Sequence, residues 1–208
     1  VAAQGSVRIE ASGPGARVQA SESAVWAAGL QPDGQLAGQQ DLSVQAAGAI
    51  ELRGLAVASG NLTLAGAALD LSRSSQQAQT VRLNATEGDL LATGSQILAR
   101  DELQLNTPKA LVTDGARLQA GAIALQAGDW RNRAGQIVQT GVKNPGAAQG
   151  GSQVVAQVGT LDNTEGQIRA AGDLQLHLQG DHTLAGTLQA DGDVRIDTTG
   201  RLTNPVSV

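Results

Sequence analysis

A short pattern recurs in this sequence at a nearly constant interval, and that interval restricts the folds open to the chain. Each copy has a small polar residue, an aliphatic residue, any residue, and a second aliphatic residue. The first aliphatic positions are Leu42, Leu62, Val81, Leu103, Ile123, Leu174 and Val194. Neighbouring copies lie 19 to 22 residues apart, except for one long interval between the fifth and the sixth copy. Periods of this length are typical of solenoids, in which every repeat forms one layer of a stack.

Local alternation identifies the repeated unit as a strand. Leu42 and Val44 alternate with the polar Ser43 and Gln45, and a second group of aliphatic residues follows about half a period later. Alternation with period two is typical of strands, and the gaps are too short for the crossover helices of an α/β fold. We therefore predict an all-β chain that folds as a right-handed parallel β-helix (β-solenoid) with about 20 residues per coil.

An antiparallel sandwich or barrel is the alternative all-β architecture. Such folds need hairpin turns, whose strongest signals are Asn-Gly and Asp-Gly pairs between strands. Those pairs are scarce at the strand junctions of this sequence, and the period is too regular for a set of unequal hairpins. The parallel β-helix is the better interpretation.

The composition suits thin, regular coils. The chain has no Phe, Tyr, Met or Cys, so its core must consist of Leu, Val, Ile and Ala, and neither disulfides nor thiolate metal sites can form. The net charge of −5 argues against nucleic acid and anionic membrane surfaces as main partners, because both attract clustered Lys and Arg. No apolar stretch approaches the roughly 18 residues of a membrane span, so we expect no membrane insertion.

Interruptions of the regular repeat spacing divide the chain into four parts. We expect irregular coils over residues 1–39, regular coils over 40–140, a protruding loop over 141–152, and coils with an additional motif over 153–208. The loop is rich in Gly, Pro and Asn, which favour turns. Because the sequence begins without Met and ends without a polar tail, we also expect it to be a fragment of a longer chain.

The additional motif overlays the first one in the C-terminal part of the chain. The segment from Trp130 to Ile137 (WRNRAGQI) parallels the segment from Leu161 to Ile168 (LDNTEGQI), and a third copy begins at Leu202. This motif resembles the haemagglutinin repeat of the filamentous haemagglutinin family, large exoproteins that two-partner systems of Gram-negative bacteria secrete. The family includes adhesins and the stick-like proteins of contact-dependent growth inhibition.

The shared positions of the motif are Asn and Gly residues, and we interpret them as structural: Asn132, Gly135, Asn163, Gly166 and Asn204. An Asn side chain at a turn can bond the backbone, and stacked copies can form a ladder. Gly135 and Gly166 are expected to allow a left-handed turn before the next strand.

The resemblance implies a location and a set of partners. It implies a chain that is secreted or held at the bacterial outer surface, with an outer-membrane two-partner-secretion transporter for the parent protein. It also implies a receptor protein or glycan on another cell as a possible partner. On this basis we expect a rigid shaft segment of a large exoprotein that displays a binding or toxin tip, such as an adhesin or a growth-inhibition stick.

Two other functions remain open. The chain could itself bind a receptor or glycan, with Trp26, Lys143 and Asn144 as the candidate binding surface, since loops on a rigid scaffold commonly carry recognition. Trp26 could equally be buried, where a Trp fills a widened coil. The third possibility is a β-helical polysaccharide lyase or hydrolase.

Catalytic chemistry has weak support in the sequence. The best acidic cluster is Asp181, Asp191, Asp193 and Asp197, but Asp-Gly-Asp before a strand is ordinary turn chemistry, and nothing builds a cleft for paired carboxyl groups. His177 and His182 lack an evident third metal ligand and are interpreted as surface residues. We therefore predict no enzymatic activity, no catalytic residue, no cofactor and no metal site.

Overall fold

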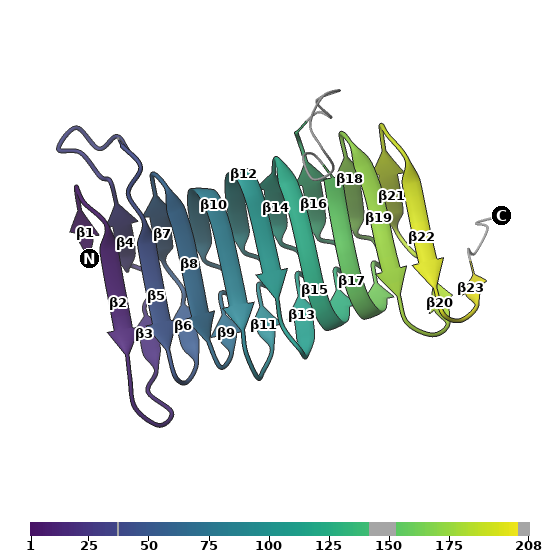
Figure 1. The fold of residues 1–208 in the computed structure, drawn as a ribbon, viewed down its shortest axis with the longest axis horizontal. Coiled ribbons are helices and arrows are strands. Elements are labelled where there is room, and N and C mark those ends of the chain that lie inside the picture. Colours follow the sequence, from purple (N-terminus) through teal and green to yellow (C-terminus); the bar gives the residue numbers. More distant parts are fainter. Residues whose placement is uncertain (37, 142–152, 204–208) are drawn as a thin grey trace.

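The chain forms one long stack of parallel coils. The computed structural model describes residues 1–36, 38–141 and 153–203, and its regular elements in these ranges are all strands. Strands pair in parallel from coil to coil, and the chain advances 20, 19, 22 and 20 residues from Leu42 through Leu62, Val81 and Leu103 to Ile123. Figure 1 shows the successive coils side by side along the long axis. The predicted all-β class and the stacked parallel coils of a solenoid are confirmed.

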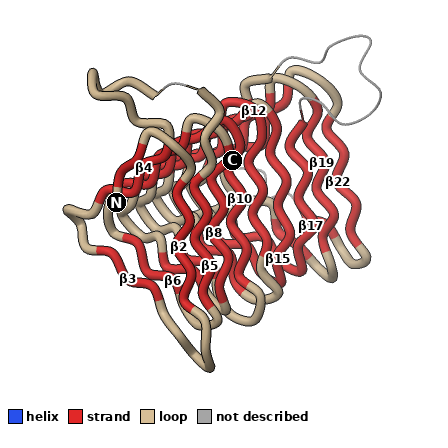
Figure 2. The backbone as a smooth tube through the Cα atoms, turned by 60° about the vertical axis from the view of Figure 1, so that its left-hand side comes forward, coloured by secondary structure: helices blue, strands red, loops and turns tan. Residues whose placement is uncertain are grey.

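Each coil from β2 to β18 contributes one strand segment to each of three ladders. The first ladder contains β2 (Val7–Ala11), β5 (Leu42–Ala46), β8 (Asn61–Gly66), the second halves of β10 (Ser75–Ala85) and β12 (Gln96–Asn106), the first halves of β15 (Ala122–Arg131) and β17 (Gln153–Asp162), β19 (Asp173–Leu178) and β22 (Val194–Thr198). Figure 2 shows β2, β5, β8 and β10 of this ladder in sequence along the stack.

The other two ladders have shorter strands. The second ladder contains β3 (Val18–Ala20), β6 (Ile50–Leu52), β9 (Leu69–Asp70), β11 (Leu90–Leu91), β13 (Ala110–Val112) and the second halves of β15 and β17. The third ladder contains β1 (Ala2–Ala3), β4 (Val25–Ala28), β7 (Leu55–Ala58), the first halves of β10 and β12, β14 (Arg117–Ala120), β16 (Gln136–Gln139), β18 (Gln167–Ala170) and β21 (Thr187–Ala190). Near the C-terminal end, β20 (His182–Thr183) pairs with β23 (Leu202–Thr203) as a separate sheet.

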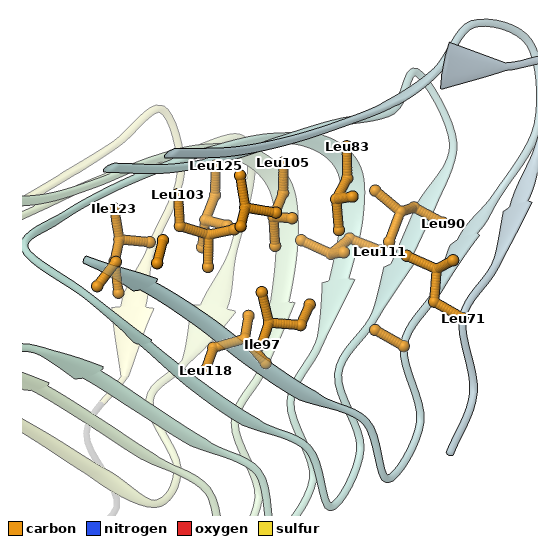
Figure 3. Packing of buried hydrophobic residues seen from close by; sticks show 14 of the residues in the cluster. Leu71, Leu83, Leu90, Ile97, Leu103, Leu105, Leu111, Leu118, Ile123 and Leu125 are labelled. Carbon is orange, nitrogen blue, oxygen red and sulfur yellow. The ribbon is translucent and has the colours of Figure 1, made fainter. Parts of the chain in front are cut away.

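The inward side chains of all three ladders form one core. Because the strands are in register, equivalent residues stack in columns, as Leu103 on Ile123 and Leu105 on Leu125 do in Figure 3. Leu62 and Leu103 have no exposed surface. A single coil cannot bury its own apolar face, so the stability of the fold comes from the burial of aliphatic surface between neighbouring coils.

The N-terminal part of the chain also forms a coil. β2 pairs with β5, β3 with β6 and β4 with β7, so residues 7–28 continue the three ladders. Two long corners obscure this coil in the sequence: residues 12–17 join β2 to β3, and residues 29–41 join β4 to β5. Within the second corner, Leu30 and Leu36 form an isolated antiparallel bridge. The spacing irregularity therefore lies in the corners and not in the strands.

Candidate functional site

Five β-turns lie in register between the second and third ladders. In each turn the amide of the fourth residue donates to the carbonyl of the first, and the turns are Leu71–Ser74, Ala92–Ser95, Thr113–Ala116, Asn132–Gly135 and Asn163–Gly166. Positive φ occurs at the third residue alone, as in a type II turn: Arg73, Gly94, Gly115, Ala134 and Glu165. Further bonds join neighbouring turns, for example from the Ala134 amide to the Thr164 carbonyl at 3.0 Å. The turns therefore continue the backbone pairing of the ladders.

Thr113, Asn132 and Asn163, the first residues of the last three turns, form a column of buried polar side chains. Asn132 Nδ2 donates to Asn163 Oδ1 at 2.7 Å, and Thr113 Oγ1 lies 2.8 Å from Asn132 Oδ1. Asn163 Nδ2 continues the series with a bond to the Ala185 carbonyl at 3.1 Å. The two asparagines are 0% and 2% exposed. A buried amide is costly unless it is hydrogen-bonded, so each member of the column depends on its neighbours.

Gly135 and Gly166 have a different role from the one expected. The left-handed residues are Ala134 and Glu165, with φ of 51° and 58°, one position before each glycine. A Cβ at Gly135 would lie 2.1 Å from Asn132 Oδ1, and a Cβ at Gly166 would lie 2.3 Å from Asn163 Oδ1. Glycine is required here because the inward Asn carboxamide and a backbone carbonyl of the preceding coil, from Thr113 or Asn132, occupy the space that a side chain would need.

Trp130 anchors the N-terminal end of this column. It stacks between Leu111 and Leu161 in the second ladder and is 1% exposed, as expected for a residue in an aliphatic position. Its indole Nε1 donates to Thr113 Oγ1 at 3.0 Å. The largest fully buried side chain thus has its one polar atom satisfied by the same column.

The outer face of these turns carries ion pairs between coils. Both terminal nitrogens of Arg53 bind the carboxylate of Asp70, at 2.6 and 2.5 Å, and Ser72 Oγ donates to the same carboxylate. The hydrogen bond from Arg53 lowers the pKa of Asp70 from 3.8 to about 2, and the same bond raises the pKa of Arg53. At Asp162, bonds from Thr164 and then from Arg133 lower the pKa of the carboxyl group.

Corner aspartates form a second kind of contact between coils, which the sequence reasoning missed. Each carboxylate accepts a backbone amide of the next coil, 19 to 21 residues later. The donors are Asn61 to Asp41, Ala110 to Asp89, Arg133 to Asp114, Asp193 to Asp173 and Arg201 to Asp181, at 2.6 to 3.1 Å. An Asp before a strand, repeated at the coil period, is the signal that could have revealed them.

Of the three residues proposed as a binding surface, the structure describes only Trp26. Trp26 is 6% exposed and belongs to the core, where it stacks on the small Ala56 of the next coil. This placement removes Trp26 from the candidate surface, because its ring fills the interior of the N-terminal coils. Lys143, Asn144 and the loop segment 142–152 lie outside the described residues, as does Asn204.

Two members of the acidic cluster, Asp181 and Asp197, and both histidines have structural partners. Asp197 binds Arg195 at 2.8 Å and His177 at 3.1 Å on the outer face of the first ladder. His182 is not at the surface as expected: it is 6% exposed, and its Nε2 lies 2.8 Å from the Gln179 carbonyl. Among residues 1–36, 38–141 and 153–203, no group of three or more His, Asp or Glu side chains is placed to hold a metal ion.

Two shallow hollows share a rim on the outer face of the first ladder. One has a volume of about 360 Å³ and is lined by uncharged residues, with Ala124 and Val155 between carboxamide side chains. The other, of about 440 Å³, contains His177 and Asp197. Gln126 and Gln157 border both hollows.

In the described part of the chain no helix is long and apolar enough to cross a bilayer.

Comparison with known proteins relates this chain to a segment of two CdiA proteins. The chain is 33% identical over 210 residues to the toxin CdiA of Yersinia pestis, an alignment that covers 87% of this chain and 6% of the relative. It is 31% identical over 96 residues to the tRNA nuclease CdiA-2 of Burkholderia pseudomallei (strain 1026b), covering 46% of this chain and 3% of that relative. The chain is a homologue of a segment of CdiA exoproteins. The expected relationship to two-partner-secretion exoproteins of contact-dependent growth inhibition is confirmed.

The chain spans less than a tenth of the length of these CdiA relatives. No protein-family profile matches it. No solved structure matches it either.

The names of the CdiA relatives correct one expectation. We predicted no enzymatic activity, yet one relative is named a toxin and the other a tRNA nuclease. The prediction was wrong: it rested on the lack of a cleft for paired carboxyl groups and of an evident metal site in this sequence. Enzymatic activity therefore belongs among the properties of proteins related to this chain.

Proposed function

We propose that this chain is a rigid shaft segment of a CdiA-type exoprotein that stands at the bacterial surface and holds a receptor-binding or toxin-bearing part away from the cell. The observation that carries the proposal is the continuous register of the first ladder, from β2 to β22. Each coil adds about 4.8 Å of hydrogen-bonded length. A rod of this kind resists bending because every coil is bonded to both neighbours.

The same proposal includes the partners that the CdiA relationship suggests. The parent chain would leave the cell through an outer-membrane two-partner-secretion transporter and fold outside. The lack of Cys fits this route, since a disulfide formed in the periplasm would hinder threading of an extended chain. A receptor on a target cell would be contacted by the part that the shaft displays.

The shaft role can be tested by removing whole coils. In a CdiA-type exoprotein that carries this segment, deletion of residues 81–122 joins Thr80 to Ile123 and keeps the register, since Val81, Leu103 and Ile123 occupy one column. The rod becomes shorter by about 10 Å. We expect surface display and growth inhibition of target cells to persist.

Leu103→Asp is the matched variant that keeps the length but disrupts the stack. It places a carboxylate at a position with no exposed surface, so the folded segment and the activity should both be lost. The shaft proposal fails if the coil deletion abolishes growth inhibition while the amount of folded protein on the cell surface is unchanged.

Recognition of a receptor or glycan by this segment itself is the second candidate function. The observation that favours it is the uncharged hollow on the first ladder, where the carboxamides of Gln126 and Gln157 offer both donors and acceptors to a hydroxyl-rich ligand. Binding of the purified chain to whole target cells tests it. Loss of a measured signal on Val155→Arg, or on deletion of 142–152, would support recognition.

A further inference from the structure

Gln139 interrupts a column of small side chains. The second inward position of the third ladder is alanine in every other complete coil: Ala28, Ala58, Ala78, Ala99, Ala120, Ala170 and Ala190. Gln139 stands between Ala120 and Ala170 in register and is 1% exposed. A buried carboxamide needs hydrogen-bond partners, so its presence among alanines calls for a specific explanation.

Both the nitrogen and the oxygen of this carboxamide bond to backbone atoms, at the corners of three successive coils. Nε2 donates to the Gly121 carbonyl at 2.6 Å and to the Gly141 carbonyl at 2.5 Å. Oε1 accepts from the Gly172 amide at 2.9 Å. The three glycines belong to three successive coils, so one side chain joins the corner of its own coil to the corners on both sides.

This corner differs from its neighbours in length. Three residues join Ala170 to Leu174 and three join Ala190 to Val194, whereas fourteen join Gln139 to Val154. In the next corner the Gly192 amide donates directly to the Gly172 carbonyl at 3.0 Å. One coil earlier, the equivalent bond would join the Gly172 amide to the Gly141 carbonyl. Instead, the Gln139 carboxamide bridges these two groups: it accepts from the Gly172 amide and donates to the Gly141 carbonyl.

The other long corner on the same edge uses side chains in a similar way. Residues 29–41 also join the third ladder to the first, and where they return to the stack, Ser59 Oγ accepts the Gln40 amide at 3.0 Å. Ser6 Oγ accepts the Asp41 amide at 3.0 Å. Both long corners are therefore closed by side-chain bonds to backbone amides. They lie five coils apart, roughly 24 Å along the axis.

We propose that the edge between the third and first ladders is where this fold accepts additional residues in its corners. At the longer of the two corners, Gln139 is the residue that holds the neighbouring coils together. Its carboxamide replaces the direct bond between neighbouring corners that the additional residues separate. The coils before and after the insertion therefore remain one continuous stack, whatever the inserted segment contains. The contacts of Gln139 carry this proposal independently of the shaft role.

A cycle of four proteins tests it. Deletion of 142–152 leaves Thr140, Gly141 and Gln153 between Gln139 and Val154, which is the usual three-residue corner. The four are the full chain, Gln139→Ala, the deletion, and the deletion with Gln139→Ala. The readouts are the urea midpoint and the hydrogen exchange of the Gly172 amide. Alanine is the residue of the other coils, so the substitution suits the fold.

In the full chain, Gln139→Ala should speed exchange at Gly172 by at least about tenfold and lower the urea midpoint, because the amide loses its acceptor. In the deletion background the same substitution should change exchange by less than about twofold, since the Gly141 carbonyl can then accept the Gly172 amide directly. Gln136→Ala, on the exposed side of the same strand, is the control and should change neither readout. Equal effects of Gln139→Ala in both backgrounds, or unchanged exchange in the full chain, would overturn the proposal.

Discussion

Asn132 and Asn163 form a direct amide-to-amide bond of 2.7 Å between two coils, in the interior of the protein. A second Asn–Asn bond between two coils is exposed to solvent: Asn106 Nδ2 donates to Asn84 Oδ1 at 2.8 Å on the outer face of the first ladder. The two pairs share chemistry and coil spacing and differ in burial. Their comparison separates the effect of burial from the effect of the bond itself.

Asn132→Ala should lower the free energy of unfolding by about 2 kcal/mol, because it leaves Asn163 Oδ1 buried without its donor. Asn106→Ala should change it by less than about 0.5 kcal/mol, because water replaces the lost partner. Urea unfolding followed by circular dichroism measures both. If both variants lowered the free energy of unfolding equally, the buried column would contribute no more to stability than the exposed Asn pair.

Gly135→Ala should be strongly destabilising, by about 2 kcal/mol or more, because the new Cβ meets Asn132 Oδ1 and a rigid backbone carbonyl. Ala134→Gly is the matched change at the preceding residue. It should be neutral or stabilising, by up to about 1 kcal/mol, because it relieves a positive φ at a residue with a side chain. Thermal unfolding of the two variants distinguishes a spatial requirement for glycine from a conformational one. The reverse order of stabilities would refute the assignment.

The Arg53–Asp70 pair predicts part of the acid sensitivity. The pKa of Asp70 is lowered from 3.8 to about 2 in the folded protein, so its contribution is present above about pH 4 and disappears as the pH falls toward 2. The contribution is about 1–2 kcal/mol, allowing for partial exposure of the pair. Asp70→Asn should lower stability at pH 7 and flatten the curve between pH 4 and 2. Glu87→Gln, at an exposed position, should leave the shape of the curve unchanged.

Two leucines of β12 test the core. Leu103 has no exposed surface, whereas Leu98, on the same strand, is 40% exposed. Leu103→Ala should lower the free energy of unfolding by about 2–5 kcal/mol through lost burial and the cavity that remains. Leu98→Ala should cost less than about 1 kcal/mol. Similar costs at both positions would contradict the inward column to which Leu103 belongs.

The period of the sequence was sufficient to predict the coils, because each stacked layer must place an aliphatic residue in the same column. Leu42, Leu62 and Leu103 were assigned inward from spacing alone, and the structure places them there. The N-terminal coil was not predicted, since its long corners place Leu42 35 positions after its partner Val7. The number of residues between equivalent positions in neighbouring coils includes the corners as well as the strands. One long corner therefore makes a regular coil look irregular in the sequence.

The local chemistry was harder to predict than the coils. The motif drew attention to Asn132 and Gly135, but glycine is needed because the Asn132 carboxamide and the Thr113 carbonyl of the preceding coil fill the space of a side chain, which follows from the fold and not from the motif. Gln139 resembles any outward Gln in the sequence, and its role depends on glycines 18 and 33 residues away. Trp26 could not be placed, because the long corners hid the register of its own N-terminal coil, and with it the pairing of Trp26 with Ala56.

The most direct test of the stacked rod is one distance. Ser43 and Gln175 occupy the same outward column of the first ladder, six coils apart. The chain has no Cys, so Ser43→Cys and Gln175→Cys give two unique spin-label sites for pulsed electron paramagnetic resonance. A continuous stack predicts one narrow distribution near 29 Å, about 4.8 Å for each coil, unchanged when 142–152 is deleted. A broad distribution, or a distance that shifts with that deletion, would contradict the continuous rod.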